Sequence, residues 1–485
     1  MRAFFPVFAV LGGVLMLFAA AMLVPLAFAF FGADEALLAY DEAILATFAT
    51  GLALFLTGRR SRRELLPRDG FLLVSLVWTV LPAFGALPLM IHLPALSFTD
   101  AYFEAMSGLT TTGATVLTGL DALPLSINVW RCLMVLIGGM GILVLAVAIL
   151  PLLGVGGSQL FKAETPGPMK DQKLTPRIAE TARGLWAVYF TIATACFFAY
   201  RVAGMGWADA FMHMCSTMGL GGFSSHDASF AAFDSPTIEA VAIVFMLIAG
   251  VNFALYFVAF KRRSARGVWA DIEARLFLLV VLGAVLVVAV FLRVHDVYPS
   301  FGEALRHAAF SVVSVATTTG FATVDYAQWP AFAPVLMLFL CCFATCAGST
   351  GGGIKMVRAL LLVKGARREF KRIVHPRAVV PVTLGDAAVD TNVLQSVLAF
   401  MMIYGAVMVA STMLLLFSGL DVVSAFSAVV ACINNTGPGL GEVGPAGNYQ
   451  GLSDFQTWVC SVTMLLGRLE LFSVLVLFTR TFWRK

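Results

Sequence analysis

The stretch Ser107-Gly-Leu-Thr-Thr-Thr-Gly-Ala-Thr115 decides the fold, because related segments return three more times along the chain. Ala316-Thr-Thr-Thr-Gly-Phe-Ala-Thr323 repeats its Thr-Thr-Thr-Gly core. Thr217-Met-Gly-Leu-Gly-Gly-Phe-Ser224 and Asn434-Asn-Thr-Gly-Pro-Gly-Leu-Gly441 are looser versions. The equivalent glycines, spaced by 109, 98 and 117 residues, are Gly113, Gly222, Gly320 and Gly437. This is an internal repeat of about a hundred residues, and four copies of one polar break suggest a pore that is lined four times.

The composition is that of a membrane protein. Of the 485 residues, 60% are hydrophobic and 12% are charged, whereas about a quarter of a soluble domain is charged. The apolar run near the N-terminus is too long for the ~7–15-residue core of a signal peptide, so we interpret it as a membrane helix. The eight cysteines are scattered without a C-x-x-C pair, and we interpret them as small packing residues. We therefore expect no cofactor in this chain.

Two apolar spans, about Phe4–Phe31 and Ala43–Thr57, precede a repeated pattern of outer helix, short re-entrant segment and inner helix. The expected division is 1–68 for the two leading helices and 69–165, 166–266, 267–378 and 379–485 for four pore units. The re-entrant segments are predicted to begin with half-helices at Asp100–Leu109, Trp207–Met218, Phe301–Val315 and Val422–Ile433. The inner helices are predicted at Val129–Leu153, Ile238–Phe260, Phe332–Leu362 and Phe455–Phe482. The fold class is an all-α polytopic membrane protein, since a helix needs roughly 20 apolar residues to cross a bilayer.

Lysine and arginine are concentrated on one side of this arrangement. Residues 32–43, 93–127, 204–240, 293–333 and 420–455 together hold 17 acidic residues but only two basic ones, Arg293 and Arg306. The basic stretches, by contrast, lie at Arg59–Arg68, Lys162–Arg183, Lys261–Arg266, Lys355–Arg377 and the C-terminal tail. Basic loops stay in the cytoplasm, so we predict cytoplasmic N- and C-termini and polar breaks that are entered from outside. The acidic outer face would raise the local cation concentration.

Backbone that leaves helical form at membrane depth is tolerated only when it is buried in protein or lines a wet cavity. Glycine permits positive φ, so successive carbonyl groups can turn toward one axis and replace the hydration shell of an ion. The residues expected to contribute are Thr111, Thr112, Thr318, Thr319 and Thr436, with Leu220, Gly221 and Asn435 in the corresponding places and the four glycines beside them. The alternative is that the glycines merely allow close helix packing. Four breaks on one side favour the ion path.

The third unit has a second break, Cys346-Ala-Gly-Ser-Thr-Gly-Gly-Gly-Ile-Lys355. Glycine costs about 1 kcal/mol per helical position relative to alanine, so three in a row should unwind the inner helix. We expect the resulting loop to lie just below the breaks, to obstruct the path and to act as a gate. The predicted gate residues are Gly348, Ser349, Thr350, Gly351, Gly352, Gly353 and Lys355.

Arg468 stands alone in the last apolar helix, and a buried arginine there normally faces a cavity or a partner. We favour a role facing the pore, where its charge would keep cations from binding too tightly. The alternative is a structural ion pair with Glu470 or another acid. For His213, His226 and His307 the absence of metal-like spacing indicates solvated or capping roles, and Asn252 is expected to satisfy a local hydrogen bond.

Taken together, the sequence resembles the Trk/Ktr/HKT superfamily of potassium transporters, and most closely its bacterial Trk-type membrane subunits. The motifs that carry the resemblance are Thr110-Thr-Thr-Gly-Ala-Thr115, Gly221-Gly-Phe-Ser224, Thr317-Thr-Thr-Gly-Phe-Ala-Thr323, Asn434-Asn-Thr-Gly-Pro-Gly439 and Ala347-Gly-Ser-Thr-Gly-Gly-Gly-Ile-Lys355. The resemblance implies a pseudo-fourfold pore with the four equivalent glycines in its filter. It also implies that the Gly348–Gly353 region is an intramembrane gating loop and that Arg468 is the pore arginine. Plant relatives selective for sodium have serine at the first filter position, so Gly113 favours potassium.

The same resemblance implies a homodimer in which each protomer has its own pore, controlled by a separate cytosolic ring of nucleotide-binding subunits. The leading functional hypothesis is potassium uptake across the bacterial cytoplasmic membrane, driven by membrane potential. The alternative is a secondary transporter that couples K+ to H+ or Na+. An enzyme is disfavoured because no metal-ligand cluster or nucleophile–base pair is evident, and no nucleic acid partner is expected. The basic stretch Lys364–Arg377 is predicted to meet acidic membrane lipids or the regulatory subunit.

Overall fold

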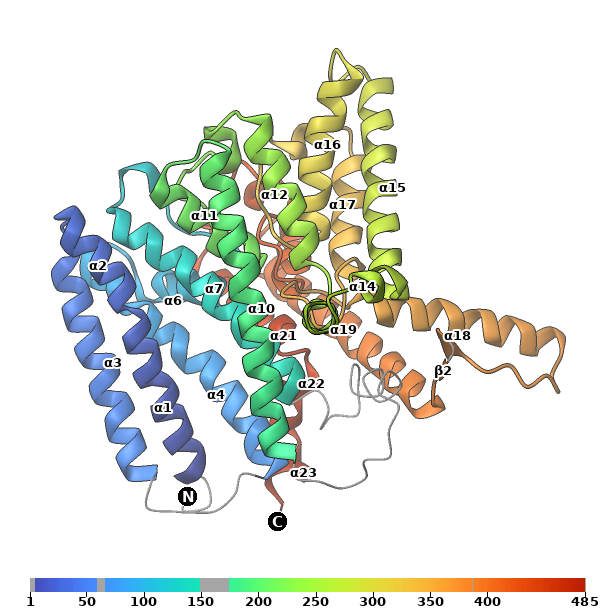
Figure 1. Cartoon of the computed structure of the whole chain (residues 1–485), viewed down its shortest axis with the longest axis horizontal. Helices are drawn as coiled ribbons and strands as arrows, with labels where there is room; N and C mark the ends of the chain where they lie inside the picture. The colour runs from blue at the N-terminus through green and yellow to red at the C-terminus, as the bar shows by residue number, and fades with distance from the viewer. Residues whose placement is uncertain (1–4, 59–65, 149–173, 386, 485) are drawn as a thin grey trace.

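The computed structural model describes residues 5–58, 66–148, 174–385 and 387–484, and these residues form a bundle of helices (Figure 1). Among them, seven helices are long and apolar enough to cross a membrane, or nine if two sharply bent pairs are counted as spans. The described strands form one short hairpin, β1 (Thr383–Leu384) with β2 (Ala387–Ala388). The basic segment 59–63 and the start of the stretch 162–183 lie outside the described residues.

The leading helices pack closely through glycines. Helices α1 (Phe5–Ala21) and α2 (Leu23–Gly32) are followed by α3 (Leu37–Gly58), which runs back along α1 at one edge of the molecule (Figure 1). A Cβ atom placed on Gly12 would lie 2.4 Å from the carbonyl oxygen of Gly51. Small residues allow such backbone approach between membrane helices, so the two predicted leading spans form a helical hairpin.

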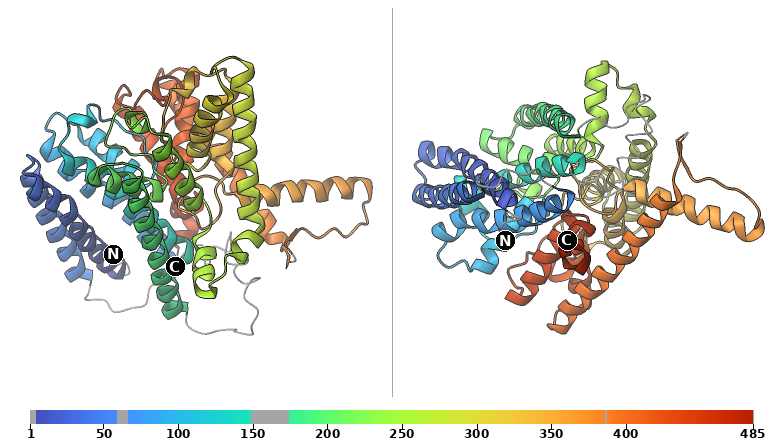
Figure 2. Two further views of the ribbon diagram at one scale, coloured as in Figure 1. Left: turned by 45° about the horizontal axis from the view of Figure 1, so that its top comes forward. Right: turned by 90° about the horizontal axis from the view of Figure 1, so that it is seen from below.

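Four units follow, and each contains an outer helix, a half-helix and an inner helix. The outer helices are α4 (Pro67–Gly85) with α5 (Leu87–His92), α10 (Leu174–Val202), α15 (Ile272–Val294) and α19 (Thr391–Phe417). The half-helices are α6 (Phe98–Leu109), α11 (Trp207–Gly219), α16 (Phe301–Ala316) and α20 (Val422–Ile433). The inner helices are α7 (Leu125–Ala148), α12 (Pro236–Ala249) with α13 (Phe253–Arg262), α17 (Phe332–Phe343) with α18 (Met356–Val374), and α21 (Asp454–Arg468) with α22 (Phe472–Leu475). Seen from below, the units succeed one another around a common centre in the order of the sequence (Figure 2).

The half-helices begin with strong capping signals. Ser97 accepts a hydrogen bond from the backbone N–H of Asp100 at 3.1 Å, and Ser300 accepts one from Glu303 at 3.2 Å. Asp421 accepts bonds from the N–H groups of both Val423 and Ser424. Such caps satisfy N–H groups that have no partner within the helix. They fix the N-terminal ends of α6, α16 and α20, whereas α11 starts at Gly206 without a side-chain cap.

The predicted inner helices of the second and fourth units are wrong in one respect, since neither is continuous. Helix α13 is bent by 89° from α12, and the chain after α21 is bent by 105°. The first bend arises because the Asn252 side chain accepts the N–H of Ala254 at 2.9 Å and so starts a new helix. The second coincides with two consecutive residues of positive φ, Glu470 at 54° and Leu471 at 56°. The predicted break of the third inner helix, by contrast, is confirmed between α17 and α18.

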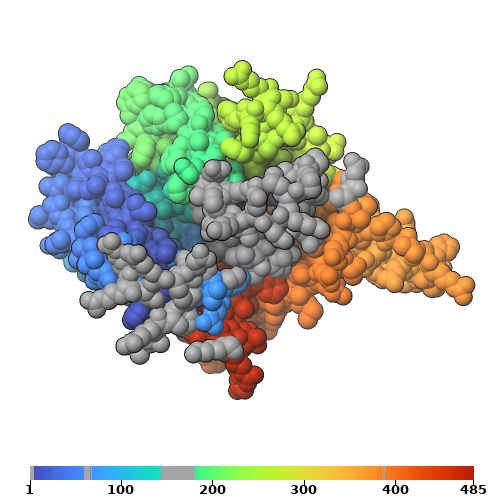
Figure 3. All heavy atoms as spheres, turned by 60° about the horizontal axis from the view of Figure 1, so that its bottom comes forward, coloured from blue at the N-terminus to red at the C-terminus, as the bar shows by residue number. Residues whose placement is uncertain are grey.

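Two short helices and one long arm complete the described chain. Helix α14 (Arg266–Ala270) lies at the lower end of α15, and α23 (Arg480–Trp483) lies near the bottom of the molecule (Figure 1). Helix α18 extends sideways well beyond the rest of the bundle, as the orange segment in Figure 3 also shows. Its last turn contains Lys371 and Arg372, so the chain presents a basic arm on this side.

Candidate ion pathway

The four polar breaks share one backbone conformation. The second residue of each has a left-handed φ: 55° at Thr111, 54° at Leu220, 61° at Thr318 and 54° at Asn435. Two residues later, the four equivalent glycines Gly113, Gly222, Gly320 and Gly437 have φ values of 81°, 29°, 88° and 92°. Residues other than glycine rarely adopt such angles, and strained backbone of this kind clusters at functional sites. We call residues 111–113, 220–222, 318–320 and 435–437 the ring segments.

The ring segments touch one another in a closed cycle. A Cβ atom on Gly113 would lie 3.0 Å from the carbonyl oxygen of Gly221, and one on Gly222 would lie 2.4 Å from that of Thr319. A Cβ atom on Gly320 would lie 2.1 Å from the carbonyl oxygen of Thr436, and one on Gly437 would lie 2.6 Å from that of Thr112. Each unit therefore meets the next, and the fourth meets the first. A side chain would clash with backbone at Gly222, Gly320 and Gly437 and would be tightly confined at Gly113.

The N–H groups of the ring segments are bonded back into their own half-helices. Thr112 donates to the carbonyl oxygen of Ser107, Thr319 to that of Ser314 and Thr436 to that of Ala431, all at 2.8 Å. Gly221 donates in the same way to Ser216 at 3.1 Å. A trans peptide holds its N–H and C=O on opposite sides. The carbonyl groups of Thr111, Leu220, Thr318 and Asn435 therefore point away from the half-helices.

Side-chain contacts hold the ring segments in place. The hydroxyl groups of Thr110 and Thr112 lie 2.8 Å apart, and those of Thr317 and Thr319 lie 2.7 Å apart. In the fourth unit the Asn435 amide donates to the Thr112 hydroxyl at 3.0 Å, which joins the first and last units. All these residues are fully buried. The ring is thus a rigid part of the core and also receives the C-terminal, partially negative ends of four half-helices, which favours a cation at its centre.

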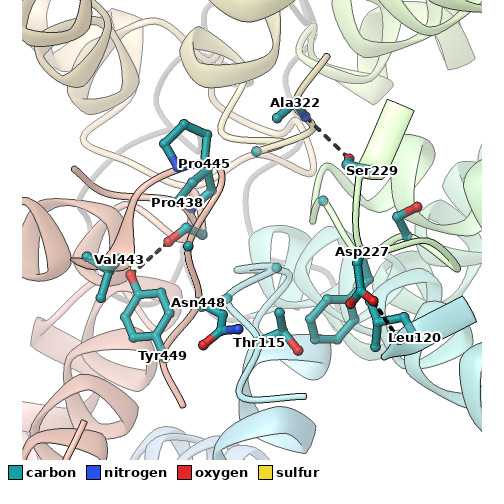
Figure 4. A pocket seen from close by; sticks show the side chains of 18 of the residues that line it. Thr115, Leu120, Asp227, Ser229, Ala322, Pro438, Val443, Pro445, Asn448 and Tyr449 are labelled. Atoms are coloured by element: carbon teal, nitrogen blue, oxygen red, sulfur yellow. Dashed lines mark hydrogen bonds between the residues drawn. The ribbon is translucent and has the colours of Figure 1, made fainter. Parts of the chain in front are cut away.

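A depression opens on one side of the ring, where residues 114–120 and 443–449 border it (Figure 4). The loops that border it are fastened to one another across unit boundaries. The backbone N–H of Tyr449 donates to the carbonyl oxygen of Thr115 at 2.9 Å, and the Tyr449 hydroxyl donates to that of Gly437 at 2.8 Å. The backbone N–H of Leu120 donates to the Asp227 carboxylate at 3.1 Å. The depression therefore has a fixed, polar rim directly above the ring.

Sequence reasoning missed a buried ion pair beside this rim. Nε of Arg131 lies 2.7 Å from the Glu104 carboxylate, and both side chains are almost wholly buried. Arg131 also donates to the carbonyl oxygen of Ser224, and Glu104 accepts the N–H of Val116, at 3.1 and 3.0 Å. Charge-assisted bonds of this kind are stronger than neutral ones. The available signal was the presence of single charges in two apolar segments, which in membrane proteins usually have partners.

A second polar segment lies against the inner side of the ring. This inner loop, residues 344–355, joins α17 to α18. Its Thr350 hydroxyl donates to the carbonyl oxygen of Met218 at 2.9 Å, and the N–H of Gly352 donates to the Thr318 hydroxyl at 2.8 Å. A Cβ atom on Gly352 would lie 1.9 Å from the carbonyl oxygen of Asn434. The loop thus touches the second, third and fourth units directly beneath the ring.

Arg468 ties this loop to two inner helices. Its guanidinium donates to the carbonyl oxygens of Thr350 and Gly138, both at 3.0 Å, and the residue is buried. The alternative prediction of an ion pair with Glu470 is wrong. Because the chain turns sharply after Arg468, the Glu470 carboxylate instead pairs with Arg358 at the start of α18. Lys355, also buried, donates to the carbonyl oxygen of Gly351, so two cationic side chains adjoin the inner loop.

The remaining polar candidates are structural. His213 is buried rather than solvated, and its ring nitrogens contact the carbonyl oxygen of Asp209 at 2.8 Å and the Ser224 hydroxyl at 3.0 Å. His226 contacts the Asp121 carboxylate at the surface of the protein. The local hydrogen bond predicted for Asn252 is confirmed. The described residues contain no group of three or more His, Cys, Asp or Glu side chains arranged to hold a metal ion.

Comparison with known proteins agrees with this architecture. The sequence model of the TrkH family, described as cation transport proteins, matches residues 40–485. The chain belongs to the TrkH family. It is 47% identical over 477 residues to the Trk system potassium uptake protein TrkH of Salmonella typhimurium, with 98% of each chain covered. It is 39% identical to the Trk system potassium uptake protein TrkG of Escherichia coli, with 98% of this chain and 97% of the relative covered.

A solved member of the TrkH family supports the fold. The crystal structure of the potassium transporter TrkH from Vibrio parahaemolyticus superposes with a TM-score of 0.92 at 44% identity and covers 99% of this chain and 100% of that one. The predicted resemblance and the all-α fold of four helix–re-entrant loop–helix units with two leading helices are therefore confirmed. The family's members are membrane transporters rather than enzymes.

Proposed function

We propose that this chain takes up K+ across the bacterial cytoplasmic membrane through the ring of four backbone segments. The observation that carries the proposal is the closed cycle of ring segments, in which four glycines meet the carbonyl oxygens of the neighbouring units. Rings of backbone carbonyl oxygens replace the hydration shell of K+ in selective channels. The relatives named above as potassium uptake proteins support this ion as the cargo.

The proposed filter contains three residues from each unit. It is formed by Thr111, Thr112, Gly113, Leu220, Gly221, Gly222, Thr318, Thr319, Gly320, Asn435, Thr436 and Gly437. Its backbone is held by hydrogen bonds to the half-helices, so its oxygens are already in position before an ion arrives. Moving one charge through 100 mV releases ~2.3 kcal/mol. The membrane potential is therefore sufficient to drive accumulation without a coupled ion.

The proposed gate is the inner loop together with Arg468. The loop contacts the inner side of the filter through Thr350 and Gly352, and Arg468 holds Thr350 from the opposite side. Ion passage requires this loop to move. Because helix α18 follows directly on the loop, a displacement of α18 is the proposed means of breaking these ties.

The proposed regulator is a separate cytosolic nucleotide-binding subunit of the Trk system, and the proposed assembly is a homodimer. Helix α18 follows directly on the inner loop and extends beyond the bundle as a basic arm (Figure 3). A cytosolic partner that binds and displaces α18 would therefore also move the inner loop. The start of α1 and helix α23 both lie at the bottom of the molecule in Figure 1, and α23 begins with the exposed Arg480, which supports cytoplasmic termini.

Electrical measurement on purified protein in liposomes tests the function. With K+ on one side, Na+ on the other and equal pH, the expected reversal potential is near the K+ equilibrium value. It should not move when a pH gradient is added. A reversal potential that follows pH or Na+ would instead establish coupled transport. Deletion of Gly351–Gly353 from the inner loop should then raise the flux, whereas an unchanged flux would refute the proposed gate.

A further inference from the structure

We propose that a pocket beside the bend of the second inner helix binds an acyl chain of an anionic phospholipid and thereby holds the inner loop in place. The inference rests on the proposed function only where it concerns ion flux. The pocket is a cavity of about 310 Å³ between the end of α12, α13, α14 and α15. Its lining is mostly apolar and includes Tyr256, the exposed Trp269 and the exposed Arg275.

The surroundings of the pocket match an anionic headgroup. Residues 261–275 contain five basic side chains, Lys261, Arg262, Arg263, Arg266 and Arg275, and all five are exposed. The same stretch contains two acids, Asp271 and Glu273, of which Glu273 is buried and bonded to the inner loop. Basic clusters at the cytoplasmic end of membrane helices attract acidic lipids. Arg275 lines the pocket and the other four basic residues belong to the same short stretch of chain, so a negative headgroup is the favoured one here.

The pocket lies at the level in the fold where the membrane surface is expected. The pocket lies where the spanning helix α15 begins and the short helix α14 turns aside from it (Figure 1). Trp269 on α14 is 66% exposed, and tryptophan is enriched at the level of lipid headgroups. We therefore expect an acyl chain from the adjacent membrane leaflet to enter this pocket.

The walls of the pocket are the same elements that fasten the inner loop. The N–H of Cys346 donates to the carbonyl oxygen of Gly250 at 3.0 Å, and the N–H of Phe253 donates to that of Gly348 at 3.1 Å. On the other wall, the Glu273 carboxylate accepts the N–H groups of Ala347 and Val357 at 2.8 and 3.0 Å. The angle between α13 and α15 thus sets both the shape of the pocket and the position of the loop.

A ligand stabilises the conformation that binds it. The pocket belongs to the arrangement in which the inner loop lies beneath the ring, so an occupant favours that arrangement. Across the bend, the Tyr256 hydroxyl donates to the carbonyl oxygen of Ile248 at 3.0 Å, and both residues line the pocket. An acyl chain packed against Tyr256 and Ile248 would stabilise the sharp angle between α12 and α13. Anionic lipid is therefore expected to lower the K+ flux of the protein without its regulator.

Two neighbouring leucines provide a matched test of binding. Leu278 lines the pocket, whereas Leu279 is 70% exposed on the adjacent face of α15. Wild type, Leu278→Trp and Leu279→Trp are purified from vesicles of phosphatidylcholine with phosphatidylglycerol, and retained phosphatidylglycerol is counted by native mass spectrometry. We expect wild type and Leu279→Trp to retain it and Leu278→Trp to lose it. Equal retention by all three proteins overturns the site.

A second pair of variants tests the charge. Arg275 and Arg293 stand at opposite ends of α15, so Arg293→Gln controls for Arg275→Gln. The Arg275→Gln protein should retain about fivefold less phosphatidylglycerol, the effect of one basic residue at an anionic surface. Phosphatidylglycerol should lower wild-type flux and should lower the flux of Arg275→Gln clearly less. If phosphatidylglycerol does not change the wild-type flux, the proposed link between the pocket and the inner loop is refuted. Absence of K+ flux in every lipid, with normal retention, refutes the proposed function and leaves the lipid site standing.

Discussion

The guanidinium of Arg468 donates a hydrogen bond to the carbonyl oxygen of Thr350 at 3.0 Å, although 118 residues separate the two in sequence. This bond joins the inner helix of the fourth unit to the loop of the third. The same guanidinium holds Gly138 of the first unit. The loop is consequently fixed by the protein around it as well as by its own glycine-rich backbone.

Replacing Arg468 should release the loop. Arg468→Met keeps much of the apolar volume but removes both donors, and a hydrogen bond to a charged group contributes ~1.5–3 kcal/mol. We therefore expect at least about a tenfold rise in K+ flux without the regulator, measured with a tracer ion in liposomes. Arg480→Met, which changes an exposed arginine in α23, should leave the flux unchanged. A fall in flux with Arg468→Met would show that the arginine assists conduction instead.

The third ring glycine is expected to be essential for selectivity. In Gly320→Ala the new Cβ would lie 2.1 Å from the carbonyl oxygen of Thr436, so the ring must open. Gly419 provides a matched control, because its φ is 93° against 88° for Gly320 and its Cβ would meet open space. Both variants incur the ~1–2 kcal/mol cost of left-handed backbone. Only Gly320→Ala should lose the preference for K+ over Na+, as judged by reversal potential.

The outer contact between Asp121 and His226 gives a pH prediction. The hydrogen bond from His226 lowers the pKa of Asp121 from its usual 3.8. A lowered pKa means that this carboxylate stabilises the folded state above pH 3.8, and that the contribution is lost as the pH falls through the folded-state pKa. Asp121→Asn should therefore lower the unfolding temperature at pH 6 but have little effect near pH 2. Asp454→Asn, at an exposed position, serves as the control. An equal effect of Asp121→Asn at both pH values would contradict the assignment.

The sequence was informative where polar and apolar stretches alternate. The half-helix Val422–Ile433 was predicted with the bounds that the structure has, because short apolar runs between a capping residue and a glycine break have few alternatives. The bend at Asn252 was not predicted, since a single asparagine in an apolar run does not reveal that it caps a new helix. The partners of Arg468 were also missed. They are backbone carbonyl groups of distant segments, which carry no signature in side-chain composition.

The Glu104–Arg131 pair should matter for stability more than any exposed pair. Removing one partner of a buried ion pair leaves an uncompensated charge and costs ~3–5 kcal/mol, so Glu104→Gln should markedly lower the unfolding temperature in detergent. Arg293 and Asp296 form an exposed pair at 2.7 Å, and Asp296→Asn should cost at most ~1 kcal/mol. The double variant Glu104→Gln/Arg131→Met removes both charges. It should therefore recover part of the loss, because the remaining amide no longer faces a buried cation. If the double variant is less stable than Glu104→Gln alone, the bonds from Arg131 to Asn128 and Ser224 are what hold the rim of the ring, and the carboxylate serves mainly to neutralise that arginine.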